Sequence, residues 1–326
     1  MRKNTKKKKH SWWSVIYGFV LVSFTAYVLL DAFVIPRSYA VVSPSSSAVT
    51  QASASQTASA SSQAAASASS AVSTSSSQAA SQTAVVTDNT YSDGNITITI
   101  TEYRENNTSI YVADIQVSSV EYLKTAFAQN VFGKNITAKT SSIAASNNAI
   151  LAVNGDFYGT RNGYVIRNGI LYRTTSAGSS QEDLVIYQDG SFGIITEGSI
   201  SASDLLAQGA WQVLSFGPAL VTNGTVSVTQ NEEVDQAMTT NPRTAIGIID
   251  SLHYVMVVSD GRTTASTGLS LYQLASFMQG LGVATAYNLD GGGSTTMYFN
   301  GTVVNNPTTN GKTITERSVS DIVYIG

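Results

Sequence analysis

Cysteine is absent from this chain of 326 residues, and histidine occurs only twice. Without cysteine the chain forms no disulfide, so its stability must come from the burial of apolar side chains. The same absence excludes a cysteine nucleophile and zinc sites built from Cys and His. A Ser-His-Asp triad would have to use His253, because His10 lies in the N-terminal tail. The apolar run around His253 instead favours a place in or beside a strand.

Basic residues are scarce outside the N-terminal tail. The first ten residues carry six Lys or Arg, whereas beyond residue 40 only 11 basic residues stand against 20 acidic ones. A nucleic-acid partner is therefore not expected, because this part has no basic surplus to neutralise phosphates. No Lys follows the glycines of "DGGGST", and no G-x-G-x-x-G is present, which argues against a nucleotide loop.

No metal or cofactor is predicted. Oxygen ligands in the Asp-Gly loops leave Ca²⁺ binding open as an alternative, although no EF-hand spacing occurs and no specific motif supports it.

One long hydrophobic run is present, at residues 11–36, directly after the basic tail of residues 1–10. A span needs about 20 mostly apolar residues, so the run predicts a transmembrane signal anchor. The basic tail orients its N-terminal end toward the cytoplasm, and the rest of the chain is then extracytoplasmic. The alternative is a signal peptide cleaved near Ala40, which would release a secreted protein.

Residues 37–88 are dominated by Ser and Ala and contain few groups that could form a packed core. This composition predicts a disordered linker. An anchor, a linker and a folded head together suggest a protein of the bacterial cell envelope.

Residues 89–326 are long enough for one substantial domain. The alternation in "NITITITEY" and the run "TSIYVADIQV" predict a β-hairpin across "RENN". Further short strands are separated by Asn-Gly and Asp-Gly turns. Only "SLYQLASFMQGLG" is convincing as a long helix, and "TSSIAASNN" predicts a shorter one. The predicted fold class is α+β, strand-rich with few helices, in a single extracytoplasmic domain.

A short internal similarity joins two parts of this domain. In both, a helix and a short apolar strand lead into an Asn-x-Asp turn, at Asn154 to Asp156 and at Asn288 to Asp290. Residues two apart in a strand project to the same side, so each pair could direct two polar groups to one place. If the similarity is structural, two polar strand ends could face one cleft.

The remaining chemistry rests on carboxylates, amides, hydroxyls and arginines. Arg243 and Arg317 each border an apolar strand, where a guanidinium needs a reason to be buried, and its planar fork suits phosphate or carboxylate. Asp156, Asp260 and Asp290 stand at strand ends beside glycine, and carboxylates of this kind perform glycosyl chemistry. A simple turn at Asp290 would not need three glycines, whereas close approach of the backbone to a ligand would.

Six segments, in this order, resemble the phosphodiester glycosidase family, and the resemblance covers roughly residues 90–326. They are "NGDFYG", "NPRTAIGI", "VSDGRT", "LYQLASFMQGLG", "NLDGGGSTTMYFNG" and "RSVSDIVYIG". The resemblance implies hydrolysis of a sugar phosphodiester at the anomeric C–O bond, which frees the sugar and leaves phosphate on the acceptor. Bacterial relatives are often described as exopolysaccharide-biosynthesis proteins.

Several residues of this chain fall on the family pattern, and Asp156 stands where members often have a small residue. The matching positions are Asn154, Arg243, Asp260, Asn288, Asp290, Gly291, Gly292, Gly293, Ser294 and Arg317. The expected catalytic residues are Asp290 and Asp260, although neither the residues nor the resemblance decides which carboxylate is acid, base or nucleophile. Arg243 and Arg317 are expected to hold the phosphate, and the other positions to bind substrate, with Asp156 among them.

The predicted function is therefore that of a membrane-anchored hydrolase that cleaves a sugar-1-phosphodiester of the GlcNAc-1-phosphate type on an envelope glycan or polymer. One alternative is a non-catalytic module that binds cell-wall glycan or teichoic acid. Another is an envelope assembly factor that acts through protein partners, which predicts an exposed apolar patch rather than a polar cleft.

Overall fold

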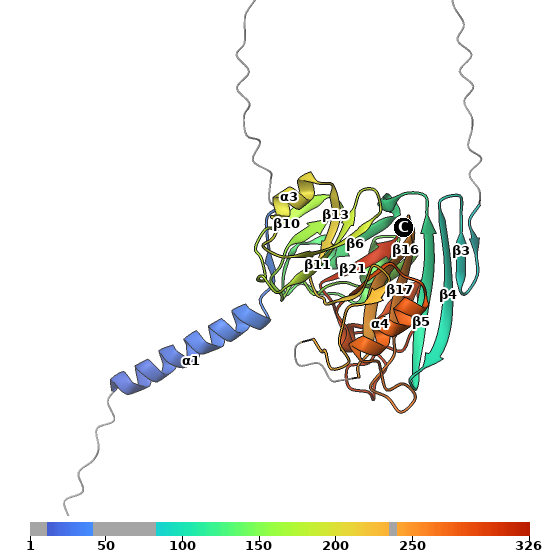
Figure 1. Ribbon diagram of the computed structural model, residues 1–326. Helices are drawn as coiled ribbons and strands as arrows, with labels where there is room; N and C mark the ends of the chain where they lie inside the picture. Colours follow the sequence, from blue (N-terminus) through green and yellow to red (C-terminus); the bar gives the residue numbers. More distant parts are fainter. Residues whose placement is uncertain (1–11, 42–82, 235–239) are drawn as a thin grey trace, which may run out of the picture.

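A computed structural model describes residues 12–41, 83–234 and 240–326 (Figure 1). Helix α1 (Trp12–Phe33) extends away from the head, is exposed along its length, and has a mean hydropathy of 1.9 in its most apolar window. Its length and composition suit a membrane span, and they suit a signal sequence equally well. The strand-rich head with few helices confirms the predicted α+β class.

The largest sheet has nine strands, and every neighbouring pair in it is antiparallel. In sheet order the strands are β15 (Thr225–Val226), β14 (Ala219–Thr222), β18 (Thr285–Asn288), β16 (Arg243–Asp250), β17 (His253–Ser259), β5 (Thr108–Val117), β4 (Ile96–Glu105), β3 (Thr90–Ser92) and β2 (Val85–Val86). Strands that are distant in sequence are therefore neighbours here, because β17 pairs with β5 and β18 lies between β14 and β16.

The predicted hairpin at the start of the head is confirmed as β4 and β5, which pair from Ile96–Val117 to Glu105–Thr108. Its two-residue turn is Asn106-Asn107, both with positive φ (47° and 53°), the geometry that favours Asn in tight hairpins. The apolar residues of β4 alternate with exposed threonines, so one face of the strand packs on the core.

Two five-stranded antiparallel sheets complete the head. The first is β20 (Thr302–Val303), β19 (Met297–Phe299), β8 (Leu151–Asn154), β21 (Asp321–Ile325) and β6 (Leu123–Phe127). The second is β10 (Ile170–Arg173), β9 (Val165–Arg167), β13 (Ala210–Leu214), β11 (Glu182–Tyr187) and β12 (Phe192–Thr196). All three sheets contribute to one apolar core, through residues such as Ile98, Val153 and Leu184.

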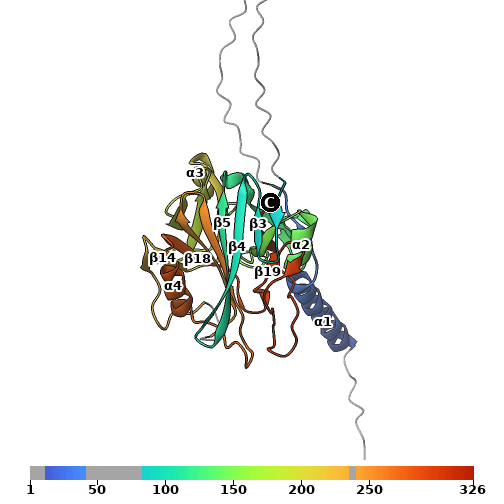
Figure 2. The ribbon, with the colours of Figure 1, turned by 90° about the vertical axis from the view of Figure 1, so that its right-hand side faces the viewer.

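Three short helices cover outer faces of these sheets. Helix α4 (Leu271–Gly280) packs on β14 and β15 and starts with a capping box between Ser270 and Gln273. Helix α2 (Thr140–Ser146) packs on β8 and β21, and α3 (Ala202–Ala207), which the sequence did not predict, packs beside β9, β10 and β13. Figure 2 shows α4 and α2 on opposite sides of β4 and β5. Single 3₁₀ turns occur at η1 (Val120–Tyr122), η2 (Ala128–Asn130) and η3 (Gly292–Ser294).

Both ends of the predicted linker pair with the head. Strand β1 (Arg37–Ser38) pairs with β7 (Gly133–Lys134), and β2 extends the nine-stranded sheet beside β3. Most of the linker, residues 42–82, lies outside the described residues.

Candidate active site

A small cavity of about 180 Å³ opens where the start of β16 and the end of β18 meet the glycine-rich turn η3. Its lining residues are Phe216, Val234, Asn241, Arg243, Arg262, Asn288, Leu289, Asp290, Gly291, Gly292 and Arg317. Six of these were expected in the site from the sequence, and the other five, among them Phe216, Asn241 and Arg262, were not among the predicted site residues.

Strand β18 delivers the first polar groups to the cavity. Ala286 and Tyr287 are fully buried in the sheet between β14 and β16, so the strand is held in place up to Asn288. The Asn288 side chain donates to the Gly217 carbonyl at 2.8 Å, and the Asp290 backbone N–H donates to the Gly155 carbonyl at 3.2 Å. These bonds fix the backbone on which the Asp290 carboxylate stands.

Asp290 is the carboxylate of the cavity, and only 9% of it is exposed. Burial raises its pKa, while Ser294, Arg317 and the Gly291 N–H act in the opposite direction. Arg317 donates to the Ser294 hydroxyl through Nε at 3.0 Å and Nη2 at 2.5 Å, and Nη2 lies 3.5 Å from Asp290 Oδ2. A carboxyl whose pKa is raised by burial, next to a guanidinium, can exchange a proton more readily than an ordinary Asp.

Arg243 begins β16 and is 3% exposed. Its Nε donates to the Leu269 carbonyl at 2.9 Å, and its Nη2 lies 2.8 Å from Glu233 Oε2. Burial lowers the pKa of Arg243, and Glu233 opposes that shift. The Arg243 guanidinium, which the sequence predicted to hold phosphate, therefore contacts the Glu233 carboxylate.

Arg262 is a third guanidinium in the cavity. Its backbone has φ of 63°, its Nε donates to Asn241 Oδ1 at 3.1 Å, and its Nη1 donates to the Thr309 carbonyl at 2.6 Å. In the sequence it stands in the Asp-Gly-Arg triplet directly after β17.

The glycines after Asp290 are required by close contacts with the chain itself. Gly292 has φ of 59°, and a Cβ there would lie 2.8 Å from Arg262 Nη2. A Cβ on Gly293 would lie 2.4 Å from Thr309 Oγ1. The Gly292 N–H donates to the Pro242 carbonyl at 2.8 Å. The glycines thus allow three segments to meet around the cavity, where the sequence had suggested close approach to a ligand.

Asn154 and Asp156 do not line the cavity. Asn154 is fully buried, donates to the Asp290 carbonyl at 2.5 Å, and accepts from Thr244 Oγ1 at 2.8 Å. Asp156 is also fully buried and accepts both of its 2.8 Å side-chain bonds from Arg167 Nη2. Asn154 can therefore act on the site only by positioning the Asp290 backbone.

Asp260 is not brought to the side of Asp290 either. It lines a different cavity, and its carboxylate accepts from the Asn306 N–H at 2.8 Å and from Asn305 Nδ2 at 3.2 Å. Asn305 Nδ2 also donates to the Thr295 carbonyl at 3.2 Å, just after the glycine turn. The geometry connects Asp260 to the site through Asn305. Ser294 stands beside the cavity and contacts Arg317.

Within residues 12–41, 83–234 and 240–326, no three His, Cys, Asp or Glu side chains gather where they could hold a metal ion. His253 lies on β17, with Nε2 3.1 Å from Asp114 on the neighbouring β5.

The head is strand-rich α+β, and its cavity brings three arginines and one buried carboxylate together. The phosphodiester glycosidase family model matches residues 147–326, more than half of the chain, so the chain belongs to this family. This confirms the resemblance that the sequence motifs indicated.

Two relatives and one solved structure show the extent of the similarity. The SPbeta prophage-derived uncharacterized protein YomE of Bacillus subtilis strain 168 is 28% identical over 180 residues, which are 54% of this chain and 28% of that protein. The mouse N-acetylglucosamine-1-phosphodiester alpha-N-acetylglucosaminidase is 30% identical over 175 residues, 48% of this chain and 33% of that enzyme. The chain thus spans about a third of the length of these relatives.

The catalytic domain of the zebrafish N-acetylglucosamine-1-phosphodiester alpha-N-acetylglucosaminidase superposes with a TM-score of 0.56 at 22% identity, covering 71% of this chain and 82% of that one. At 22% identity, this structural similarity shows that the two proteins share a fold.

Proposed function

We propose that this protein hydrolyses a sugar-1-phosphodiester of the GlcNAc-1-phosphate type at the anomeric C–O bond. The observation that carries the proposal is the meeting of Arg243, Arg262 and Arg317 with the buried carboxylate of Asp290 in one cavity. Three guanidinium groups suit a phosphate, and a single carboxylate suits the positive charge that develops on the sugar carbon. Mammalian relatives named for this reaction support the choice of substrate.

The arginines hold the phosphate and stabilise it as it leaves. Because a phosphodiester carries one negative charge, neutralisation by guanidinium groups makes the phosphate a better leaving group. Arg243 and Arg317 are the proposed clamp, and Arg262 adds a third charge on the same wall.

Asp290 stabilises the oxocarbenium-like sugar or activates the attacking water. Its burial strengthens its electrostatic effect on a charge that develops nearby. Asn288, Asn154 and the glycine turn position Asp290, and Asp260 acts as a positioning residue through Asn305.

The proposed place of action is the outer side of a bacterial membrane, with α1 as the anchor and a glycan or polymer of the cell envelope as substrate. The apolar length of α1 and the basic residues before it support this arrangement.

The test is release of free sugar from a GlcNAc-1-phosphodiester by the full chain in detergent, compared with the variants Asp290→Asn and Asp189→Asn. Asp189 is exposed in a hairpin turn and serves as the matched control. We expect Asp290→Asn to lower turnover by at least a hundredfold and Asp189→Asn to leave it unchanged. Binding of substrate without any sugar release by the wild-type chain would instead identify a glycan-binding module.

A further inference from the structure

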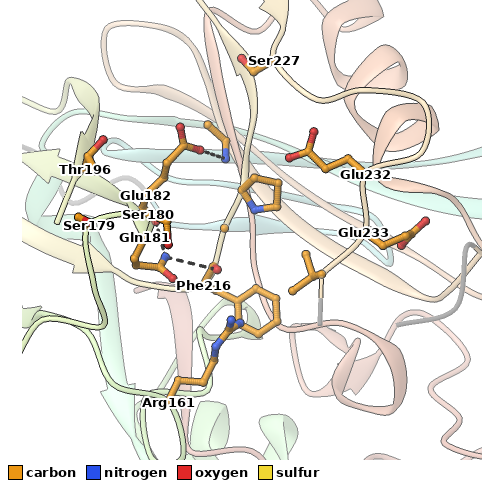
Figure 3. Close-up of a pocket in the computed structure, with 14 residues that line it drawn as sticks. Arg161, Ser179, Ser180, Gln181, Glu182, Thr196, Phe216, Ser227, Glu232 and Glu233 are labelled. Carbon is orange, nitrogen blue, oxygen red and sulfur yellow. Dashed lines mark hydrogen bonds between the residues drawn. The ribbon is translucent and has the colours of Figure 1, made fainter. Parts of the chain in front are cut away.

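A second and larger cavity, of about 670 Å³, adjoins the candidate active site (Figure 3). Phe216 and Val234 line both cavities, so they form the partition between them. The Arg161 guanidinium lies over the Phe216 ring, 4.3 Å from its centroid, which holds the ring in place.

The volumes of the two cavities indicate that a substrate occupies both of them. Pockets for small ligands have volumes of about 300–1,000 Å³, and the arginine cavity, at about 180 Å³, is below that range. It is therefore too small for both halves of a sugar phosphodiester. The larger cavity lies within that range and adjoins the arginine cavity at the shared residues Phe216 and Val234.

The larger cavity is lined mainly by hydrogen-bonding and acidic groups, with three glutamates against the one guanidinium of Arg161, which lies over the Phe216 ring. Figure 3 shows Gln181 and Glu182 on one wall and Glu232 on the opposite wall. Glu182 Oε2 accepts from the Ala219 N–H at 3.1 Å and Glu232 Oε2 from the Thr229 N–H at 2.9 Å, so one oxygen holds each side chain. No second hydrogen bond reaches either carboxylate from the described part of the chain.

These walls select by charge. Carboxylates accept hydrogen bonds from hydroxyl groups and repel a second anion, because like charges placed together are costly. The cavity therefore suits a neutral group rich in hydroxyls.

Glu233 connects the larger cavity to the proposed phosphate clamp. It lines the larger cavity, while its carboxylate contacts Arg243 of the smaller one at 2.8 Å. The larger cavity thus opens beside an arginine of the proposed phosphate clamp. In the proposed reaction this phosphate joins the sugar to an alcohol, and the alcohol retains the phosphate after hydrolysis.

We propose that the larger cavity is the subsite for the alcohol half of the phosphodiester, and that this alcohol is a neutral sugar or polyol. The proposal rests on the function proposed above. It makes Glu182 and Glu232 the residues that favour a hydroxylated alcohol over an anionic one.

The test keeps one GlcNAc-1-phosphate group and varies the alcohol esterified to it: methanol, glycerol, a hexose through its 6-hydroxyl, and glycolate. The full chain is compared with the variant Glu182→Gln/Glu232→Gln and with Glu121→Gln, an exposed control. In the double variant we expect KM for the glycerol or hexose ester to rise roughly tenfold, the bias against the glycolate ester to shrink by a similar factor, and kcat/KM for the methyl ester to stay unchanged.

The relative kcat/KM of the glycerol and hexose esters shows which alcohol the cavity takes. Equal effects of the double variant on all four esters would overturn the subsite. Failure of the wild-type chain to hydrolyse even the methyl ester would overturn the proposed function itself. Glu232→Gln alone provides the same comparison without touching the strand that carries Glu182.

An independent observation concerns the segment that follows α1. Strand β1 pairs with β7 in the register Arg37–Lys134 and Ser38–Gly133, and the Tyr39 N–H donates to the Phe132 carbonyl at 2.9 Å. The rings of Tyr39 and Phe132 meet edge to face at 5.7 Å.

Gly133 makes this pairing sterically allowed, because a Cβ there would lie 1.9 Å from the Arg37 carbonyl oxygen. From these contacts we infer that the head docks directly on the segment next to α1. The pairing of Arg37 to Tyr39 with the head then sets the distance of the head from α1. If α1 is an anchor, the active site works close to the membrane surface.

Because the chain has no cysteine, the register can be tested by Arg37→Cys/Lys134→Cys, with Arg37→Cys/Lys312→Cys as the mismatched control. Cross-strand partners have a Cα separation of about 4.5–5.5 Å, within disulfide reach. With a protease site inserted after residue 60, we expect the oxidised register pair to keep the head on membranes after cleavage, and the control to release it. Release in both, or a disulfide-linked dimer, would overturn the inference.

Discussion

Two Asp–Arg pairs follow the two Asn-x-Asp strand ends, and they differ in what surrounds them. After β8, Asp156 meets Arg167, and neither side chain is more than 2% exposed. After β18, Asp290 lies 3.5 Å from Arg317, which is 42% exposed. Asp321 also contacts Arg167, at 3.1 Å. The enclosed pair has all its partners within the protein, whereas the open pair has a face left for a ligand.

The same Asn-x-Asp pattern gives both strand ends a similar local geometry. The burial of each ion pair then decides whether a ligand can reach it. A buried ion pair resists the loss of either partner, because the remaining charge is then uncompensated. Where one partner is exposed, as Arg317 is, separating the pair costs less, and in the proposed function Arg317 can then turn to a substrate phosphate.

Removal of Arg167 is expected to have the largest effect. Arg167→Met leaves Asp156 and Asp321 buried without their cation, and we expect a loss of about 3–5 kcal/mol in the free energy of unfolding. Urea denaturation followed by tryptophan fluorescence measures it. The matched variant Arg317→Met should cost less than about 1 kcal/mol; an equal loss in the two would contradict the distinction.

The same Arg317→Met variant should have the opposite profile in catalysis. It removes a guanidinium from the proposed phosphate clamp, so kcat/KM for a sugar-1-phosphodiester should fall by about 10²–10³. Arg104→Met, at an arginine that does not line this cavity and that donates to the Ala265 carbonyl, is the control. Retention of full activity by Arg317→Met would remove this arginine from the clamp.

Asp183, on β11, extends the enclosed region, and burial, with the negative charge of Glu197, raises its pKa to about 9. The unfolded chain ionises this group near the ordinary value of about 3.9. Stability should therefore fall between about pH 4 and pH 9, by at most about 1.4 kcal/mol per pH unit for this group. Asp183→Asn should lose this dependence in denaturation measured across pH, whereas the exposed Asp250→Asn should keep it.

The ionisation of Asp290 should determine the acid limb of the pH profile of activity. Since burial raises the pKa of Asp290, and ionised Asp290 is the proposed active form, the acid limb of kcat/KM should lie above the ordinary Asp value of about 3.9. Arg317 lowers this pKa, so Arg317→Lys should leave the limb nearly in place and Arg317→Met should move it to higher pH. A limb that does not move would separate Arg317 from the titrating group.

The glycine turn should give the smallest effect. Gly292→Ala places a side chain at φ of 59° and against Arg262, which should cost about 1 kcal/mol of stability. We expect KM to rise several-fold because Arg262 must move. Gly224→Ala, at φ of 72° with open space around it, controls for backbone strain alone; the same KM change in both would show that the Arg262 contact is unimportant.

Much of the fold was predictable because its signals are local. The β4–β5 hairpin follows from alternating apolar residues and an Asn pair at the turn, and α4 follows from its apolar stripe and capping box. The family and the strand-rich class are likewise confirmed. Helix α3 was missed because its six residues are too few to show a period.

The site was predictable in part, since Arg243, Asn288, Asp290, Gly291, Gly292 and Arg317 share one cavity. Asp260 and Asp156 look alike in sequence, each beside a glycine at a strand end, yet they face other partners. Arg262 was not singled out, because its approach to the glycine turn depends on two segments that are 30 residues apart. Which carboxylate faces open space is a property of packing between sheets.

The apolar helix, the hairpin turns and the motifs that mark the family can be read from the amino-acid sequence, because each depends on residues a few positions apart. That Asp290 lines a cavity while Asp156 is enclosed, and that a second cavity with acidic walls adjoins the first, follows from the packing of the three sheets. Those outcomes arise where distant strands meet, and burial there sets both the charge state of a carboxylate and whether a ligand can reach it.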